Sequence, residues 1–240
     1  MDRFFYPTLA GGMTVTLLDE EFHHLVHVLR GKVGQRVELF DGQGASAEAV
    51  VEKLSKRDAQ LSLVSEVHHE APPGVSLILG VACPKGDRLK WLVEKATELG
   101  VTELIPLVCE RSVVEPRETK LAKLEQTVIT ACKQCRRNTL MTIRDSQPLH
   151  EFVAAAPDPI WIAHPGGESL TTLLAERKTQ PLDPPLPVWG AVGPEGGFSN
   201  TEIEQCIAAG AKLVSVGRHV LRVETAVVAF AAIALADEKG

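Results

Sequence analysis

Two short segments near the C-terminus carry the residue types best suited to hold a small ligand. The first is Gly-Pro-Glu-Gly-Gly-Phe-Ser over residues 193–199, and the second is Gly-Arg-His-Val-Leu-Arg-Val-Glu-Thr-Ala over residues 217–226. Each follows a short apolar run, Val188 to Val192 and Leu213 to Val216, and each precedes an expected helix. Strand-to-helix loops meet at one end of a parallel sheet, where α/β proteins bind small ligands. The two segments therefore predict one ligand site.

The first segment also narrows the kind of ligand. Gly193, Gly196 and Gly197 allow a close approach of the backbone to a ligand or a positive φ, although a lone glycine-rich loop is more often a simple turn. Loops that hold phosphate present backbone N–H groups and avoid carboxylates, so Glu195 would repel a pyrophosphate. A ligand with a positive centre, such as the sulfonium of S-adenosylmethionine, suits this loop better.

Both segments resemble the SPOUT class of methyltransferases, and within it the RsmE family of 16S ribosomal RNA uridine-N3 methyltransferases. The pair of GPEGG (193–197) and LRxETA (221–226) is highly specific. Supporting blocks follow in the family's order and extend the resemblance over nearly the whole chain: residues 3–5, 24–30, 40–44, 94–101 and 132–138.

The resemblance implies an enzyme that transfers a methyl group from S-adenosylmethionine to N3 of a specific uridine in 16S ribosomal RNA. The residues expected to bind the cofactor are Gly193, Pro194, Glu195, Gly196, Gly197, Val216, Gly217, Leu221, Arg222 and Thr225. Two alternatives stay open, a SPOUT methyltransferase of another RNA position and a catalytically silent RNA-binding module. The intact segments argue against the silent module, because packing alone requires neither.

Methylation of a uridine at N3 requires loss of the imide proton, so negative charge on the uracil oxygens must be stabilised. We predict Arg222 for this catalytic role. Glu224 is the second catalytic candidate, since it could hold Arg222 or orient backbone amides, or it could simply begin the last helix. Glu195 and Glu224 are the candidates for a general base, and a proton lost to water is the alternative.

The net charge of −6 does not suggest a nucleic-acid-binding protein, because phosphate contacts need Lys and Arg. Basic residues nevertheless concentrate in Lys-Gln-Cys-Arg-Arg-Asn at 133–138, and such a local basic site favours a specific, structured RNA. We expect the partner to be 16S ribosomal RNA or the small ribosomal subunit. The residues expected to face RNA are Arg3, Arg30, Lys85, Arg88, Arg136, Arg137 and Asn138.

Composition predicts a cytoplasmic protein. Charged and aromatic residues appear at once at the N-terminus, which does not resemble a signal peptide, and the longest apolar run, Ala226 to Ala236, is too short to span a membrane. Five cysteines without an extracellular context favour a reducing compartment. We expect no metal site: Cys132 and Cys135 lack a second ligand pair, and His23, His24 and His27 lack a matching carboxylate site.

The periodicity predicts two domains of an α/β protein. Over residues 1–70, strands are expected at 14–18, 37–40, 45–54 and 60–67, with a helix from residue 19 to Gly31 and a hairpin turn at Asp41-Gly42. Residues 68–74, rich in Pro and Gly, form the boundary. Residues 75–240 then alternate strands and helices. Strands are expected at 75–82, 104–108, 160–163, 188–192 and 213–216, with helices at 87–99, 118–136, 170–177, 199–209 and 224–236.

The resemblance adds what periodicity does not reveal. It implies that residues 1–70 form a small PUA-like β-barrel that binds RNA. It implies that residues 75–240 form a SPOUT domain with a parallel sheet and a deep trefoil knot, assembled as a homodimer. Two positions depart from the family pattern, which has an acid at Lys133 and a glycine at Arg136. Both changes add positive charge, and they put the local loop shape in doubt.

Overall fold

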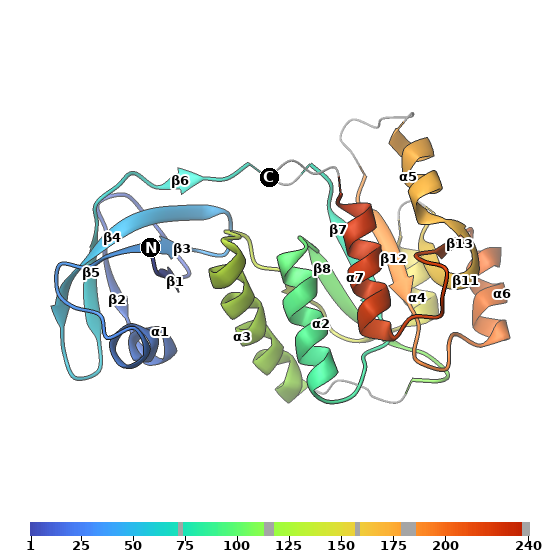
Figure 1. The fold of residues 1–240 in the computed structure, drawn as a ribbon, viewed down its shortest axis with the longest axis horizontal. Coiled ribbons are helices and arrows are strands. Elements are labelled where there is room, and N and C mark those ends of the chain that lie inside the picture. Colours follow the sequence, from blue (N-terminus) through green and yellow to red (C-terminus); the bar gives the residue numbers. More distant parts are fainter. Residues whose placement is uncertain (72–73, 113–117, 157–158, 179–185, 237–240) are drawn as a thin grey trace. The chain divides into compact units, whose positions relative to one another are not determined.

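The computed structural model describes residues 1–71, 74–112, 118–156, 159–178 and 186–236. The chain divides into two compact units, residues 1–72 with 132–140, and residues 73–131 with 141–240 (Figure 1). The division therefore differs from the expected boundaries in one respect. The stretch 132–140, which the sequence placed in the second domain, belongs to the first unit, and the contacts described below explain why.

The first unit contains one mixed, curled six-stranded sheet. The strands run in the order β1-β3-β4-β5-β2, and β6 pairs with β4 beside this path. They are β1 (Arg3–Phe5), β2 (Thr14–Leu17), β3 (Arg36–Phe40), β4 (Ala45–Leu54), β5 (Ala59–Leu63) and β6 (His68–His69). β1 is parallel to β3, whereas the other pairs are antiparallel.

The helical segment of the first unit closes one side of its core. α1 (Asp19–His23) continues into a wider π-helical turn, η1 (His24–Val28), and the segment ends at Arg30, whose φ is +54°. Gly31 therefore does not end the helix through a positive φ. It is needed for space, since a Cβ there would lie 2.5 Å from Cδ1 of the fully buried Leu25.

The hairpin between β3 and β4 receives the segment 132–140. Gly42 has a φ of +76°, and the Asp41 carboxylate accepts hydrogen bonds from the backbone of Gln43 and Ala45 at 2.7 and 2.9 Å. The backbone of this loop exchanges hydrogen bonds with residues 138–140, at 3.1 Å from Gly44 N to Asn138 O and 2.9 Å from Leu140 N to Gly42 O. These bonds tie the segment to the first unit.

The second unit contains a seven-stranded sheet whose pairs are all parallel. The order is β10-β8-β7-β12-β11-β13, and β9 also pairs with β8. The strands are β7 (Leu77–Val81), β8 (Glu103–Val108), β9 (Thr142–Ile143), β10 (Gln147–Pro148), β11 (Trp161–Ser169), β12 (Val188–Val192) and β13 (Lys212–Ser215). Their apolar runs are typical of strands covered on both faces.

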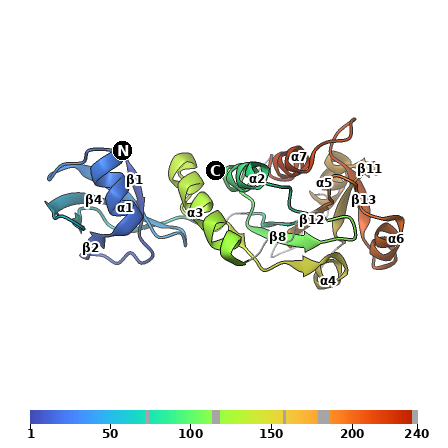
Figure 2. The ribbon, with the colours of Figure 1, turned by 90° about the horizontal axis from the view of Figure 1, so that it is seen from below.

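Helices cover both faces of this sheet. The helices of residues 75–240 are α2 (Asp87–Glu98), α3 (Glu118–Cys135), α4 (Leu149–Ala155), α5 (Leu170–Lys178), α6 (Asn200–Ala208) and α7 (Val223–Ala234), and the last turn of α3 belongs to the first unit. Figure 2 shows α2 and α7 on one face and α4 and α6 on the other. Among the described residues, no helix combines the length and the apolar character needed to cross a bilayer.

Small residues let these helices approach the strands closely. A Cβ on Gly80 of β7 would lie 2.7 Å from the ring of Phe152 on α4, and a Cβ on Gly190 of β12 would overlap the ring of Phe230 on α7. Both phenylalanines are fully buried. α6 begins with a capping box, in which Ser199 and Glu202 exchange hydrogen bonds of 2.7 and 3.2 Å. The sheet is therefore held rigidly beneath the loops at its carboxyl end.

Candidate functional site

A cleft of about 360 Å³ lies where β12 and β13 end, beside the middle of β11. Its walls are the loop after β12, the loop between β13 and α7, and part of β11, so the two sequence segments do meet as the topology predicts. Predicted cofactor residues that line it are Gly193, Pro194, Glu195, Gly196, Gly197, Val216, Gly217 and Leu221. A cleft of this size, open at the ends of parallel strands, suits a small organic ligand.

The glycines of the first segment serve different purposes. A Cβ on Gly193 would lie 2.9 Å from the ring of Phe198, which is itself buried at the base of the loop. Gly197 adopts a φ of +69°, a conformation that glycine enters without a steric penalty. Gly196 has neither constraint, and its carbonyl accepts a hydrogen bond of 2.9 Å from Arg111 Nη1. Arg111, which sequence reasoning missed, thus holds the rim of the loop.

Sequence reasoning also missed a third part of the cleft wall, which comes from β11. β11 changes register against β13 between Ala163 and Glu168, and the intervening irregularity places Ala163, His164 and Pro165 on the cleft. Ser215, His219 and Val220 complete the opposite side. A period-2 pattern would not continue through such an irregularity, so the short apolar run at 160–163 gave no sign of these residues.

Two predicted cofactor residues, Arg222 and Thr225, do not line the cleft. Both side chains are exposed at the start of α7, where Arg222 is the residue preceding the first helical turn. Their neighbours Leu221, Val223 and Ala226 do line it. At the start of α7, Leu221, Val223 and Ala226 therefore face the cleft. Arg222 and Thr225 face the solvent beside it.

The carboxylates of the two segments share one arginine. Arg88, near the start of α2, lies 3.1 Å from Glu195 (Nη2 to Oε1) and 4.0 Å from Glu224 (Nη1 to Oε2). Glu224 is 7% exposed, and its Oε2 accepts no hydrogen bond from the described residues. The sequence assigned Arg88 to RNA and suggested that Glu224 holds Arg222. In the structure the ion-pair partner of Glu224 is Arg88.

The contact with Arg88 reduces the negative charge of the GPEGG loop. The sequence reasoning treated Glu195 as an isolated negative charge, but Arg88 balances it at 3.1 Å. One arginine faces two carboxylates, so the group keeps an excess of one negative charge. The loop still attracts a ligand with a positive centre. The attraction is weaker than that of an unpaired carboxylate.

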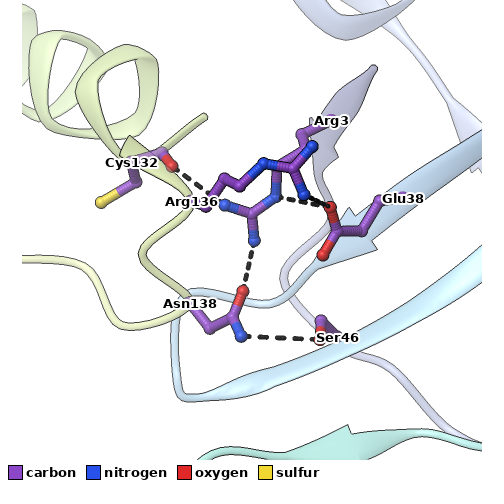
Figure 3. Close-up of polar contacts among 6 residues, drawn as sticks. All are labelled: Arg3, Glu38, Ser46, Cys132, Arg136 and Asn138. Carbon is purple, nitrogen blue, oxygen red and sulfur yellow. Dashed lines mark hydrogen bonds and ion pairs between the residues drawn. The ribbon is translucent and has the colours of Figure 1, made fainter. Parts of the chain in front are cut away.

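Arg3, expected to face RNA, is buried inside the first unit (Figure 3). Its guanidinium donates a hydrogen bond of 3.1 Å to the carbonyl of Cys132, another to the side-chain oxygen of Asn138, and lies 3.1 Å from Glu38. Burial lowers the pKa of Arg3, and the charge of Glu38 opposes that shift. Cys132 is in the last turn of α3, where carbonyls lack helical partners, so Arg3 caps that helix. We therefore assign Arg3 and Asn138 to packing instead of RNA contact.

The other residues expected to face RNA lie nearer the surface. Arg30 and Lys85 are exposed, and Arg136 is 63% exposed although it lies 3.4 Å from Glu38. Arg137 is half-buried, and this burial lowers its pKa. Arg136 has a φ of +63° directly after α3, the conformation that favours glycine at a helix end. The loop thus keeps the shape that suits a glycine while carrying an arginine.

Lys133, the other departure from the family pattern, is compensated within the first unit. Its ammonium group lies 2.9 Å from both carboxylate oxygens of Glu21 on α1 and 5.4 Å from the centre of the Phe4 ring. Both charged side chains are 14% exposed. The position therefore contributes to the docking of the segment 132–140.

Comparison with known families gives first the class of protein. A model of the RNA methyltransferase domain matches residues 71–235, and a model of the RNA methyltransferase PUA domain matches residues 17–64. The first match covers most of the chain and includes every residue that lines the cleft.

Individual relatives then give the particular family. The chain is 32% identical to ribosomal RNA small subunit methyltransferase E of Synechocystis, over 89% of this chain and 70% of that protein. It is 26% identical to the Bacillus subtilis enzyme of the same name, over 89% and 86%. The crystal structure of that enzyme from Neisseria gonorrhoeae, bound to S-adenosyl methionine, has a TM-score of 0.86 at 30% identity, covering 98% and 97%. The chain belongs to the ribosomal RNA small subunit methyltransferase E family.

Proposed function

We propose that this protein uses S-adenosylmethionine to methylate N3 of a specific uridine in 16S ribosomal RNA. The observation that carries the proposal is the meeting of the GPEGG and LRxETA segments at one cleft, in a chain of the methyltransferase E family. The small-subunit substrate follows from the names of the relatives. The N3 position follows from the resemblance of the two segments to the uridine-N3 family.

The residues of the cleft fit the cofactor. Backbone-rich walls at Gly193 to Gly197 and at Val216 to Gly217 leave room for a ligand's polar groups beside N–H and C=O groups. Apolar side chains such as Leu221 and Val223 offer surface to an adenine ring or a methylene chain. The excess negative charge of the Arg88, Glu195 and Glu224 group suits a sulfonium. When bound, the cofactor supplies a methyl group on that cationic sulfur.

Arg222 serves the other half of the reaction in this proposal. Its exposed side chain is beside residues that line the cleft, and no described residue forms a hydrogen bond or ion pair with it. It is therefore available to a substrate base and would stabilise negative charge on the uracil oxygens as N3 loses its proton. Glu224, buried and facing Arg88, is better placed to hold that arginine than to accept a proton directly.

RNA binding is proposed for exposed cations of both units. Arg30 and Arg136 of the first unit and Lys85 of the second are accessible to phosphate, and Arg137 is included as a half-buried member. The match of residues 17–64 to a PUA domain supports RNA binding by the first unit. We further propose that its sheet forms a PUA-like β-barrel.

The remaining parts of the proposal concern assembly and place. We propose that the second unit contains the deep trefoil knot of the SPOUT class, with the loops around the cleft as its crossing segments. We propose a homodimer, in which the apolar α7 region takes part. Because the proposed substrate is ribosomal RNA, we also propose that the protein acts in the cytoplasm.

Mass mapping of 16S ribosomal RNA tests the proposal. Cells that lack the gene should lose one methylated uridine, and the purified protein with S-adenosylmethionine should restore it. Loss of a methyl group from a different RNA position would favour the alternative methyltransferase. Unchanged RNA, together with RNA binding by the protein, would favour the catalytically silent module.

A further inference from the structure

Among the residues that the structure describes, Arg88 alone forms ion pairs with both motif carboxylates, Glu195 and Glu224. The loop before it follows β7, which pairs with β12, so this loop and the GPEGG loop leave neighbouring strands at the same end of the sheet. The guanidinium then reaches Glu195 at 3.1 Å on one side and Glu224 at 4.0 Å on the other. Its side chain is 40% exposed, so it is neither a core residue nor a freely solvated one.

Glu224 gives this contact its significance. The residue is 7% exposed, and one of its carboxylate oxygens is buried without a hydrogen bond from the described residues. A buried carboxylate oxygen without a donor is unfavourable, and the guanidinium of Arg88 is the cation beside it. Glu195, by contrast, lines the cleft with a side chain that is 37% exposed. Arg88 thus joins a buried carboxylate in α7 to a partly exposed one in the loop.

We infer that Arg88 is a positioning residue that fixes the GPEGG loop against the start of α7 and so sets the shape of the cofactor cleft. This inference rests on the proposed function for its ligand. A planar guanidinium can face two carboxylates with separate nitrogens, whereas a lysine offers a single point charge. In this role Arg88 contacts the carboxylates of Glu195 and Glu224 at the cleft, whereas its sequence context suggested an RNA phosphate.

Charge-conserving substitution separates this role from a purely electrostatic one. In Arg88→Lys the positive charge remains but the two-sided contact is lost. We expect the Kd values of S-adenosylmethionine and S-adenosylhomocysteine each to rise about tenfold, by calorimetry, because the energy of such a coupled pair is of that order. The ratio of the two Kd values should change less than about twofold. Wild-type affinity in Arg88→Lys would overturn the inference.

Three further variants, Arg88→Gln, Glu195→Gln and the double variant, test the partnership with Glu195. Arg88→Gln should weaken both ligands as Arg88→Lys does, and Arg88→Gln with Glu195→Gln should weaken them no further than Arg88→Gln alone. Fully additive losses would mean that the two side chains act independently. Arg144→Lys is the matched control, because Arg144 makes two hydrogen bonds to Glu103 in the same unit, at 2.8 and 3.0 Å, without lining the cleft.

Amide hydrogen exchange of the ligand-free protein keeps this test separate from the proposed function. Residues 193–198 should exchange faster in Arg88→Lys than in wild type, and Arg144→Lys should leave them unchanged. Unchanged exchange in Arg88→Lys would overturn the positioning role even if both ligands bind. A wild-type protein that binds neither ligand would contradict the proposed function, while faster exchange in the variant would still establish the link.

Discussion

At the scale of single residues, some side chains fix the shape of the cleft and one, Arg222, lies exposed beside it. Gly193, Gly197 and Phe198 fix the path of the first loop, and Arg88 and Arg111 hold it from outside. In the part of the chain that the structure describes, no hydrogen bond or ion pair holds the Arg222 side chain, which lies exposed beside the cleft. Because of this contrast, we assign a structural role to the first group of residues and propose the catalytic role for Arg222.

Arg222→Ala should lower the single-turnover methylation rate by roughly a hundredfold or more, the effect of removing one donor that stabilises developing charge. Affinity for S-adenosylmethionine and for RNA should change much less, since the interaction strengthens only as charge develops. Arg222→Lys should restore the rate only in part, because lysine lacks the planar fork. Rapid-quench kinetics at saturating cofactor and RNA give the rate.

The opposite pattern would refute the assignment. If Arg222→Ala loses cofactor affinity but retains a near-normal single-turnover rate at saturation, Arg222 supports the cofactor loop and does not act on the base. Thr225→Ala is a suitable control, because Thr225 is likewise exposed at the start of α7 and lies outside the wall of the cleft.

The glycines of the loop should differ in their tolerance of a methyl group. Gly193→Ala should weaken cofactor binding about tenfold or more, because the new Cβ would meet the Phe198 ring at 2.9 Å and overpacking of this kind typically costs 1–3 kcal/mol. Gly196→Ala is the matched control, since its Cβ would lie 3.5 Å from Arg111 Cδ, an ordinary contact. Calorimetry measures the affinity and thermal melting checks the fold. Equal losses would contradict the ranking.

At the scale of elements, the end of α3 shows how the chain absorbs two unusual residues. The family pattern has an acid at position 133, and here Lys133 pairs with Glu21 on α1 at 2.9 Å. Arg136 occupies a backbone conformation that favours glycine, with a φ of +63°. Arg3 caps the same helix end through the carbonyl of Cys132. The segment 132–140 is therefore held by paired charges as well as by backbone hydrogen bonds.

A charge reversal tests this pairing. Lys133→Glu should destabilise the protein by about 1–3 kcal/mol, because it leaves Glu21 facing a like charge at a site that is largely removed from solvent. Glu21→Lys combined with Lys133→Glu should recover most of the loss. Recovery will be incomplete, since Glu21 also accepts a hydrogen bond of 3.3 Å from Phe5 N. Chemical denaturation measures both changes, and no recovery in the double variant would contradict the pairing.

Sequence periodicity located the long elements and missed the short ones. The expected helix at 87–99 is α2 at Asp87–Glu98, and the expected strand at 188–192 is β12. By contrast β1, β9, β10 and the short α4 were not predicted. Strands of two or three residues are too short to show a period, and α4 has under two turns of clear pattern.

The candidate site was predictable where it depends on local sequence. Glycine-rich loops after apolar runs identified most of the wall of the cleft at 193–197 and 216–221. Contacts between distant residues were not accessible: Arg88 with Glu195, Arg111 with Gly196, and Arg3 with Cys132 each join separate parts of the chain. Local spacing carries no information on such partners.

At the scale of the whole molecule, the five cysteines are distributed over both units. Burial raises the pKa of the Cys83 and Cys109 thiols to about 12, and it also raises that of Cys206. At pH 8 these thiols keep their proton, and the thiolate is the reactive form. Cys135 is only partly buried and lies in the first unit.

We therefore expect iodoacetamide at pH 8 to label Cys135 first in the folded protein. Cys83 and Cys109 should react at least about a hundredfold more slowly, because their folded thiolate fraction is very small. Raising the pH from 7 to 9 should leave them protected, whereas denaturant should expose all the thiols. Mass spectrometry of labelled peptides gives the order, and early labelling of Cys83 without unfolding would contradict it.

The acidic charge of the whole molecule sets the conditions under which it can bind RNA. With a net charge of −6, long-range attraction to RNA is weak, so affinity must come from a few placed cations. Arg30 and Arg136 are exposed at the ends of helical segments of the first unit, and Arg137 is half-buried next to Arg136. Each proposed phosphate contact should contribute about one unit to the salt dependence of binding.

Alanine variants of Arg30, Arg136 and Arg137 should each weaken RNA binding and lower the slope of log K against log salt by about one. Arg36→Ala is the control for loss of a surface charge, because Arg36 is 68% exposed in the same unit and pairs with Glu48 at 3.2 Å. It should leave the slope unchanged. Filter binding between 50 and 200 mM salt measures the slopes, and melting separates a folding defect in Arg137→Ala. Wild-type slopes in all three variants would return these arginines to the solvated surface, and the RNA would then have to bind elsewhere.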